Sequence, residues 1–149
     1  MKNFVLILTL LFSFSCFSQK EDYIDLKAFY STAIKNKIDY TKKKDHYYFF
    51  TDDSMNNYLP ENIDGHKVNY INIYHKKNKK LLKKGIFVFK ISPIRIKGNR
   101  ILIYITDFGI SRRNKKHYDF ANAGGSITTF EYSCTTNKWE FIGTKHHGI

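Results

Sequence analysis

Two basic clusters contain the side chains whose types and spacing suit chemistry with an anion. A high density of positive charge attracts phosphates, anionic lipid and acidic polymers, and arginine adds a planar fork for bidentate contacts with phosphate or carboxylate. If the fold brings the clusters together, they form one binding surface. If the fold keeps them apart, each cluster is also explained as a solvated loop or helix face. The first cluster is Lys76, Lys77, Lys79, Lys80, Lys83 and Lys84, and the second is Arg112, Arg113, Lys115 and Lys116.

Histidines offer a second kind of chemistry, general acid–base catalysis. Two that converge beside a lysine would suit phosphodiester cleavage, because one group takes a proton and the other supplies one. The first catalytic set to suspect is His117 with Arg113 and Lys115. Catalysis by this set would make the chain a small secreted hydrolase of the nuclease type. The six histidines are His46, His66, His75, His117, His146 and His147.

Metal and cofactor sites are not expected. Adjacent strand residues such as His146 and His147 point to opposite faces, and no Cys or His spacing typical of zinc sites occurs. Residues 123–126 lack the spacing and the lysine of a phosphate loop. Because they precede a strand rather than a helix, they predict a bulge or a sharp bend.

Two further motifs are given structural roles. Asp52 and Asp53 follow an apolar run and precede a polar helical turn, where short carboxylates cap the first amide groups. Cys134 is placed on an aromatic strand face, where burial raises the pKa of a thiol and leaves it inert.

The first residues have the pattern of a signal peptide. A positive start is followed by residues 4–12, an almost wholly apolar run too short to cross a bilayer. Cys16 and Ser18 then occupy the −3 and −1 positions of a cleavage site. We therefore expect a signal peptide over residues 1–18 and a single exported domain over residues 19–149, in the periplasm or outside the cell.

Cys16 allows a different processing. A lipoprotein signal peptidase would cut before it and leave an acylated thiol, although Ser13, Phe14 and Ser15 lack the usual leucine and small residues. No second apolar stretch approaches roughly 20 residues, so no transmembrane segment is expected after cleavage. Cleavage after residue 18 leaves Cys134 alone, which excludes the disulfide-stapled class of small secreted proteins.

Composition sets the broad class. With 149 residues, 42% of them hydrophobic and 17% aromatic, the chain fits one folded domain and not a disordered one. A start rich in Lys, Asn, Phe, Leu and Ile, a Phe-Ser-Gln cleavage region and a body with 21 Lys against 4 Arg, 18 Ile and 12 Asn resemble small exported proteins of flavobacteria and their relatives. The resemblance implies that part of the net charge of +12 reflects coding bias.

The first half of the mature chain predicts one helix and several short elements. Apolar residues spaced by three to five predict an amphipathic helix over residues 21–39. A β-prone run at 46–50 is followed by a brief helical turn that Pro60 ends. Residues 61–67 are expected to be a polar connection, and residues 68–74 a strand.

The second half predicts two hairpins. Residues 86–97 and 100–106 flank Gly98 and Asn99, which suit a two-residue turn. This pairing sets Ile96 opposite Ile101, Ile94 opposite Ile103 and Ser92 opposite Ile105, as one apolar face, with Pro93 at an edge or a bulge.

The second hairpin joins residues 126–134 to 139–143 through the loop 135–138. It places Cys134 opposite Trp139 and Tyr132 opposite Phe141. Residues 109–125, which are polar, basic and contain glycine, are expected to form a long excursion.

These elements predict an α+β fold in which the N-terminal amphipathic helix packs on an antiparallel sheet with C-terminal hairpins, in a cystatin-like or nuclear-transport-factor-like manner. The function that we expect is that of a non-enzymatic binding module of the cell envelope or extracellular space, such as an immunity or inhibitor protein. Its partner would be a protein or an anionic polymer, with nucleic acid less favoured. The secreted hydrolase is the alternative, and attachment to a membrane surface through the lysines or a lipidated Cys16 is the third possibility.

Overall fold

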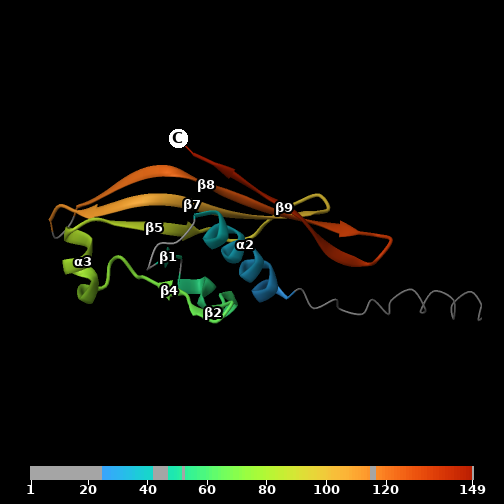
Figure 1. Cartoon of the computed structure of the whole chain (residues 1–149), viewed down its shortest axis with the longest axis horizontal. Coiled ribbons are helices and arrows are strands. Elements are labelled where there is room, and N and C mark those ends of the chain that lie inside the picture. The colour runs from blue at the N-terminus through green and yellow to red at the C-terminus, as the bar shows by residue number, and fades with distance from the viewer. Residues whose placement is uncertain (1–24, 42–46, 52, 115–116, 149) are drawn as a thin grey trace, which may run out of the picture.

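The chain has 149 residues, of which the computed structural model describes residues 25–41, 47–51, 53–114 and 117–148. The predicted signal peptide lies outside the described residues, as do Asp52, Lys115 and Lys116. One long, twisted sheet forms the frame, with α2 packed across it and α3 near one end (Figure 1). In chain order the described elements are α2 (Leu26–Thr41), β1 (Tyr48–Phe50), η2 (Asp53–Tyr58), β2 (Asn62–Ile63), β3 (His66–Lys67), β4 (Asn69–Tyr70), η3 (Lys76–Asn78), α3 (Lys79–Lys83), β5 (Ile86–Ile91), β6 (Arg95–Lys97), β7 (Arg100–Arg112), β8 (Tyr118–Ser133) and β9 (Lys138–His147).

The predicted α+β class is confirmed. The strand order of the main sheet is β4-β1-β5-β7-β8-β9, and β6 pairs with β7 in line with β5. The pairs β5 with β7, β7 with β8 and β8 with β9 are antiparallel. The sheet as a whole is mixed, because β1 runs parallel to both of its neighbours.

The predicted N-terminal helix is confirmed as α2. Its N-terminal turn is capped by Asp25, whose side chain accepts a hydrogen bond from the N–H of Ala28 at 3.0 Å. One face of the helix is buried against the sheet, and it carries Phe29, Tyr30, Ala33, Ile34 and Lys37. The apolar members follow the three-to-four spacing that the sequence shows, whereas Lys37 is a charged residue at a core position.

Two hydrophobic cores lie on opposite faces of the sheet. The larger one is under α2 and includes Phe89 and Ile91 of β5, while the smaller one includes Val88 of the same strand together with Leu82 of α3. Successive side chains of a strand point to opposite faces. β5 therefore contributes to both cores, which explains its continuous run of apolar residues.

The predicted turn at Gly98 and Asn99 is confirmed. Ile96 lies opposite Ile101, as expected. The predicted pairing of Ser92 with Ile105 is wrong, because Ile91 takes that place and the chain leaves the ladder around Pro93 before β6 begins. The expected break at the proline is thus present. The continuous apolar face ends early, since Ile96 on the short outer strand β6 is 67% exposed.

The second predicted hairpin is present with a different register. Tyr132 lies opposite Trp139. The loop is residues 134–137, one position earlier than expected, and Asn137 takes its left-handed conformation with φ of 52°. Cys134 is therefore a loop residue and is exposed, so its predicted burial is wrong.

The predicted excursion over residues 109–125 is wrong. β7 and β8 continue through it as a long hairpin, and only residues 113–117 connect them. Of its polar residues, Asp119 and Asn122 lie on exposed strand positions. The predicted irregularity at residues 123–126 is confirmed as a bulge: Asp107 pairs with Gly124 and Phe108 with Asn122, so Ala123 is the extra residue.

The segment between α2 and η3 is less regular than expected. The predicted helical turn is the 3₁₀ helix η2. Residues 61–67, predicted to be a connection, contain the small hairpin of β2 and β3, whose turn residues Asp64 and Gly65 both have positive φ. Of the strand predicted over residues 68–74, only β4 pairs with the sheet.

Candidate functional site

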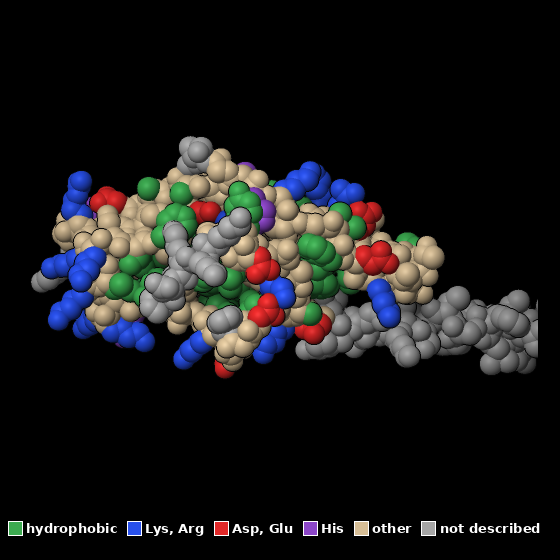
Figure 2. All heavy atoms as spheres, in the orientation of Figure 1, with side chains coloured by type: hydrophobic (Ala, Val, Ile, Leu, Met, Phe, Trp, Pro, Cys, Tyr) green, Lys and Arg blue, Asp and Glu red, His purple; other side chains and the backbone are tan. Residues whose placement is uncertain are grey.

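The fold brings the two predicted basic clusters to the same end of the molecule. In Figure 1, α3 lies beside the connection between β7 and β8, and Figure 2 shows Lys and Arg side chains gathered at this end. The ring of Tyr74, just before η3, meets the ring of Tyr118 at the start of β8 with their centroids 5.5 Å apart. We call this surface the basic end and define its described residues as Lys76, Lys77, Lys79, Lys80, Lys83, Lys84, Arg112 and Arg113.

Two local features present the lysines to solvent. His75 starts η3, because its Nδ1 accepts a hydrogen bond from the N–H of Lys77 at 3.2 Å. Leu82 is fully buried and fixes α3 on the sheet. The lysines of η3 and α3 therefore lie on the outer side, where all are exposed except the half-buried Lys79.

Arg112 differs from the other members of the basic end. The sequence predicts it on an exposed excursion. Side chains alternate between the two faces along β7, so Arg112 lies on the same face as buried Ile110, and only 7% of it is exposed. Its guanidinium carbon lies 5.8 Å from the centre of the Tyr118 ring. Its Nε is buried without a hydrogen-bond partner.

Two of the three residues suspected of hydrolysis, Arg113 and His117, lie in the turn between β7 and β8. His117 donates its backbone N–H to Oδ1 of Asn114 at 3.0 Å, and its Nδ1 lies 2.9 Å from the same oxygen. Arg113 faces Asp119 at 3.8 Å on the exposed surface. Lys115 lies outside the described residues. Among those that are described, no hydrogen bond joins His117 to a second histidine, so the proton-transfer pair stays a prediction.

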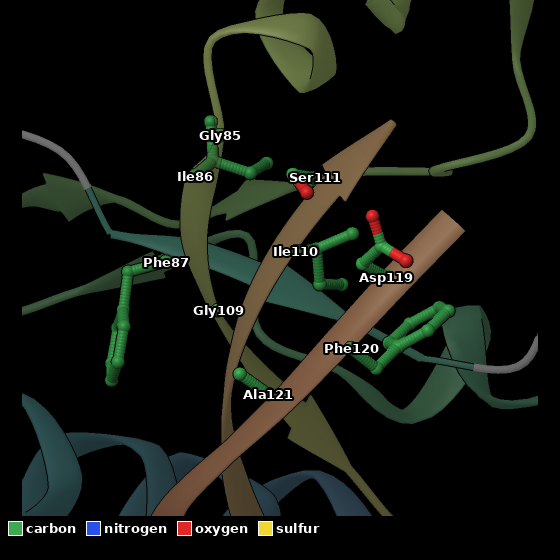
Figure 3. Close-up of a pocket in the computed structure, with 9 residues that line it drawn as sticks. All are labelled: Gly85, Ile86, Phe87, Gly109, Ile110, Ser111, Asp119, Phe120 and Ala121. Carbon is green, nitrogen blue, oxygen red and sulfur yellow. The ribbon is translucent and has the colours of Figure 1, made fainter. Parts of the chain in front are cut away.

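An open depression of about 480 Å³ adjoins the basic end. Phe87, Gly109 and Ala121 are paired across three strands and share the face that α2 covers further along the sheet. The small side chains of Gly109 and Ala121 leave this face hollow. Figure 3 shows the lining residues, which are Gly85, Ile86, Phe87, Gly109, Ile110, Ser111, Asp119, Phe120 and Ala121.

The depression and the basic end are adjacent in the chain, but the depression lies on the face of the sheet opposite to α3. Gly85 directly follows Lys84, and Ser111 directly precedes Arg112. Phe120 is paired with Ile110, so its side chain, which is 46% exposed, lies on the same face as α3. This end of the sheet thus places one exposed aromatic side chain on the same face as α3 and Arg112.

A second polar cluster, which sequence reasoning missed, lies under the C-terminal part of α2. The Nζ of Lys37 is 2.8 Å from both carboxylate oxygens of Asp107, and the lysine side chain is 1% exposed. Asp107 continues the alternation of buried Ile103 and Ile105, and Lys37 continues the buried stripe of α2. These positions were the available signal, because each places a charged residue where an apolar one is expected.

His146 borders this cluster. Its ring stacks on that of Tyr40 with centroids 3.7 Å apart, and its Nδ1 is buried without a hydrogen-bond partner. Burial lowers the pKa of His146, and so do the charges of Lys37 and, less strongly, His147, while Asp107 opposes the shift. The folded protein therefore favours the neutral imidazole.

This histidine predicts a loss of stability in mild acid. The unfolded chain takes up a proton near pH 6.5, whereas the folded protein resists it. The free energy of unfolding should fall as the pH drops below about 6.5 toward the lowered folded pKa. Urea denaturation measured from pH 7.5 to 5 checks this. His146→Gln should flatten the dependence and the exposed His75→Gln should keep it; equal slopes for both variants would contradict the assignment.

No group of three or more His, Cys, Asp or Glu side chains is placed to hold a metal ion within the described ranges. No described helix is long and apolar enough to cross a membrane. Comparison of the chain with protein-family models, with curated proteins and with solved structures found no match to any of them.

Proposed function

We propose that this chain is an exported, non-enzymatic binding protein that docks an acidic protein on its basic end and the exposed ring of Phe120. An immunity protein or an inhibitor is the concrete form of this role. The observation that carries the proposal is the convergence of two clusters, separated by almost thirty residues of sequence, at one end of the sheet, where the exposed ring of Phe120 lies on the face that α3 packs against. Export is inferred from the sequence pattern of residues 1–18.

The mixture of surfaces favours a protein over a polymer as the partner. Protein interfaces combine an apolar, often aromatic centre with a polar rim, whereas interfaces with nucleic acid are more polar throughout. The exposed ring of Phe120, on the same face of the sheet as α3, provides an apolar centre, and the lysines of η3 and α3 provide the charged surroundings. Positive rim charge selects partners with a negative surface and speeds their association.

Charge reversal tests the docking surface. The exported chain is used as bait with its own envelope and culture fractions, captured proteins are identified by mass spectrometry, and the affinity of a stoichiometric partner is then measured. We expect Lys76→Glu combined with Lys80→Glu to weaken that affinity by about tenfold or more. The difference should shrink at high salt, because salt screens exposed charges.

Lys97→Glu combined with Lys138→Glu is the matched control. Both lysines are exposed, the change in net charge is the same, and the two side chains belong to the hairpins at the other end of the sheet. Equal weakening by the two double variants would show that only net charge matters and would contradict the docking surface. Binding to anionic vesicles or cleavage of a phosphodiester in place of protein capture would support the membrane or hydrolase role instead.

A further inference from the structure

Arg112 is a buried cation without a counter-charge among the residues that the structure describes. It is 7% exposed, and its Nε is sealed from solvent with no hydrogen-bond partner. No carboxylate of the described residues lies within ion-pair distance of its guanidinium. Its guanidinium carbon lies 5.8 Å from the centre of the Tyr118 ring.

This arrangement is costly for the free protein. A buried charge loses hydration that only a paired charge or good hydrogen bonds restore. A cation over an aromatic ring regains only part of that loss. Lys37, the other strongly buried cation of the described chain, shows the usual solution, because it is paired with Asp107 at 2.8 Å.

The surroundings of Arg112 increase its need for an anion. η3, α3, Lys84 and Arg113 add seven positive charges at this end, and the nearby carboxylate of Asp119 faces Arg113. The local potential is therefore positive, which favours binding of an anion from outside.

We propose that Arg112 is the anchor of an oxyanion subsite in the basic end, and that it pairs with a carboxylate of the acidic partner protein. The inference rests on the proposed function and names the group that the site recognises. A guanidinium matches the two oxygens of a carboxylate in a bidentate pair, which a lysine cannot reproduce. Tyr118 holds the guanidinium in place before the partner arrives, so little side-chain entropy is lost on binding.

The first test measures stabilisation by a short glutamate peptide. Denaturation of the exported chain is followed with and without tetraglutamate at constant ionic strength, and the apparent affinity is taken from the increase in stability. We expect Arg112→Met to weaken this affinity by about tenfold or more, because a charge-assisted pair is lost. In the absence of peptide, Arg112→Met should be at least as stable as the original chain, because an unpaired buried charge is gone.

Arg95→Met is the matched control. Arg95 also lies over a tyrosine ring, 4.9 Å from the centre of Tyr104, but it is exposed and belongs to β6. It should leave the affinity for tetraglutamate unchanged. Arg112→Lys keeps the charge and removes the fork, so it should weaken binding even if the methionine variant folds poorly.

Three outcomes would overturn the subsite. The first is an equal loss of tetraglutamate affinity in Arg112→Met and Arg95→Met. The second is no loss of that affinity in Arg112→Met or Arg112→Lys. The third is stronger stabilisation by inorganic phosphate than by tetraglutamate at equal ionic strength. The proposed function fails separately. If Arg112→Met still captures the partner while Lys76→Glu with Lys80→Glu does not, the docking surface stands without this anchor.

Discussion

Replacing Lys37 with methionine is expected to lower the free energy of unfolding by about 3–5 kcal/mol. The Nζ of Lys37 lies 2.8 Å from both oxygens of Asp107, and both residues are buried between α2 and the sheet. Methionine would leave the carboxylate of Asp107 in this place without its counter-charge. Urea denaturation at pH 7.5 measures the loss.

Two controls isolate the buried pair. Lys35→Met removes an ion pair from the same helix with a similar distance, 2.7 Å to Asp64, but both of its side chains are about half exposed, so stability should change little. Lys37→Met combined with Asp107→Leu removes both charges and should recover most of the loss. A Lys37→Met protein as stable as the Lys35→Met protein would contradict the closed pair.

Truncating Phe89 to alanine is expected to cost about 3–5 kcal/mol of unfolding free energy. Its ring is 1% exposed, lies 5.3 Å from the ring of Phe49 and is 5.2 Å from the Nζ of Lys37. The side chain therefore fills the core and also covers the ion pair. Alanine would leave a cavity and admit water to the charges, which thermal or urea unfolding would detect.

The stability lost when a phenylalanine is truncated should depend on how deeply it is buried and, for Phe89, on the charge of Lys37 beside it. Phe120→Ala, at a residue that is 46% exposed, should lose much less than Phe89→Ala. Phe89→Ala combined with Lys37→Met should cost less than the sum of the two single losses, because both act on the same contact. Strict additivity would show that Phe89 does not shield the pair.

The parts of the fold that the sequence predicts are those fixed by neighbours in the chain. The stripe of Phe29, Ala33 and Ile34 is enough to indicate α2, and Gly98 with Asn99 is enough to indicate a turn. The irregularity around Pro93 follows from its missing N–H. Each of these signals acts within a few residues.

The long hairpin of β7 and β8 could not be predicted in the same way. Residues 109–125 are polar and contain glycines because many of them occupy exposed strand positions, and composition alone does not distinguish such a strand from a loop. The bulge at Ala123 also shifts which residues share a face. The pairing itself depends on contacts between distant parts of the chain.

In the candidate site, too, the sequence predicts the features that depend on residue type and misses those that depend on contacts between distant residues. Residue type reveals the lysines of η3 and α3, and their exposure agrees with their type. The burial of Arg112 follows only from the register of β7. The sequence predicts this strand to end at residue 106, whereas it continues to Arg112. The pairing of Lys37 with Asp107 joins residues 70 positions apart, so neither residue alone predicts its partner.

The division of the hydrophobic residues into two cores has a consequence for local opening. α3 and the tips of β7 and β8 depend on the smaller core, while α2 depends on the larger one. Regions held by fewer buried contacts exchange their amide hydrogens through partial opening before the whole domain unfolds. The basic end would then belong to the less stable cooperative unit of the molecule. A bound partner would slow hydrogen exchange there and leave α2 unaffected.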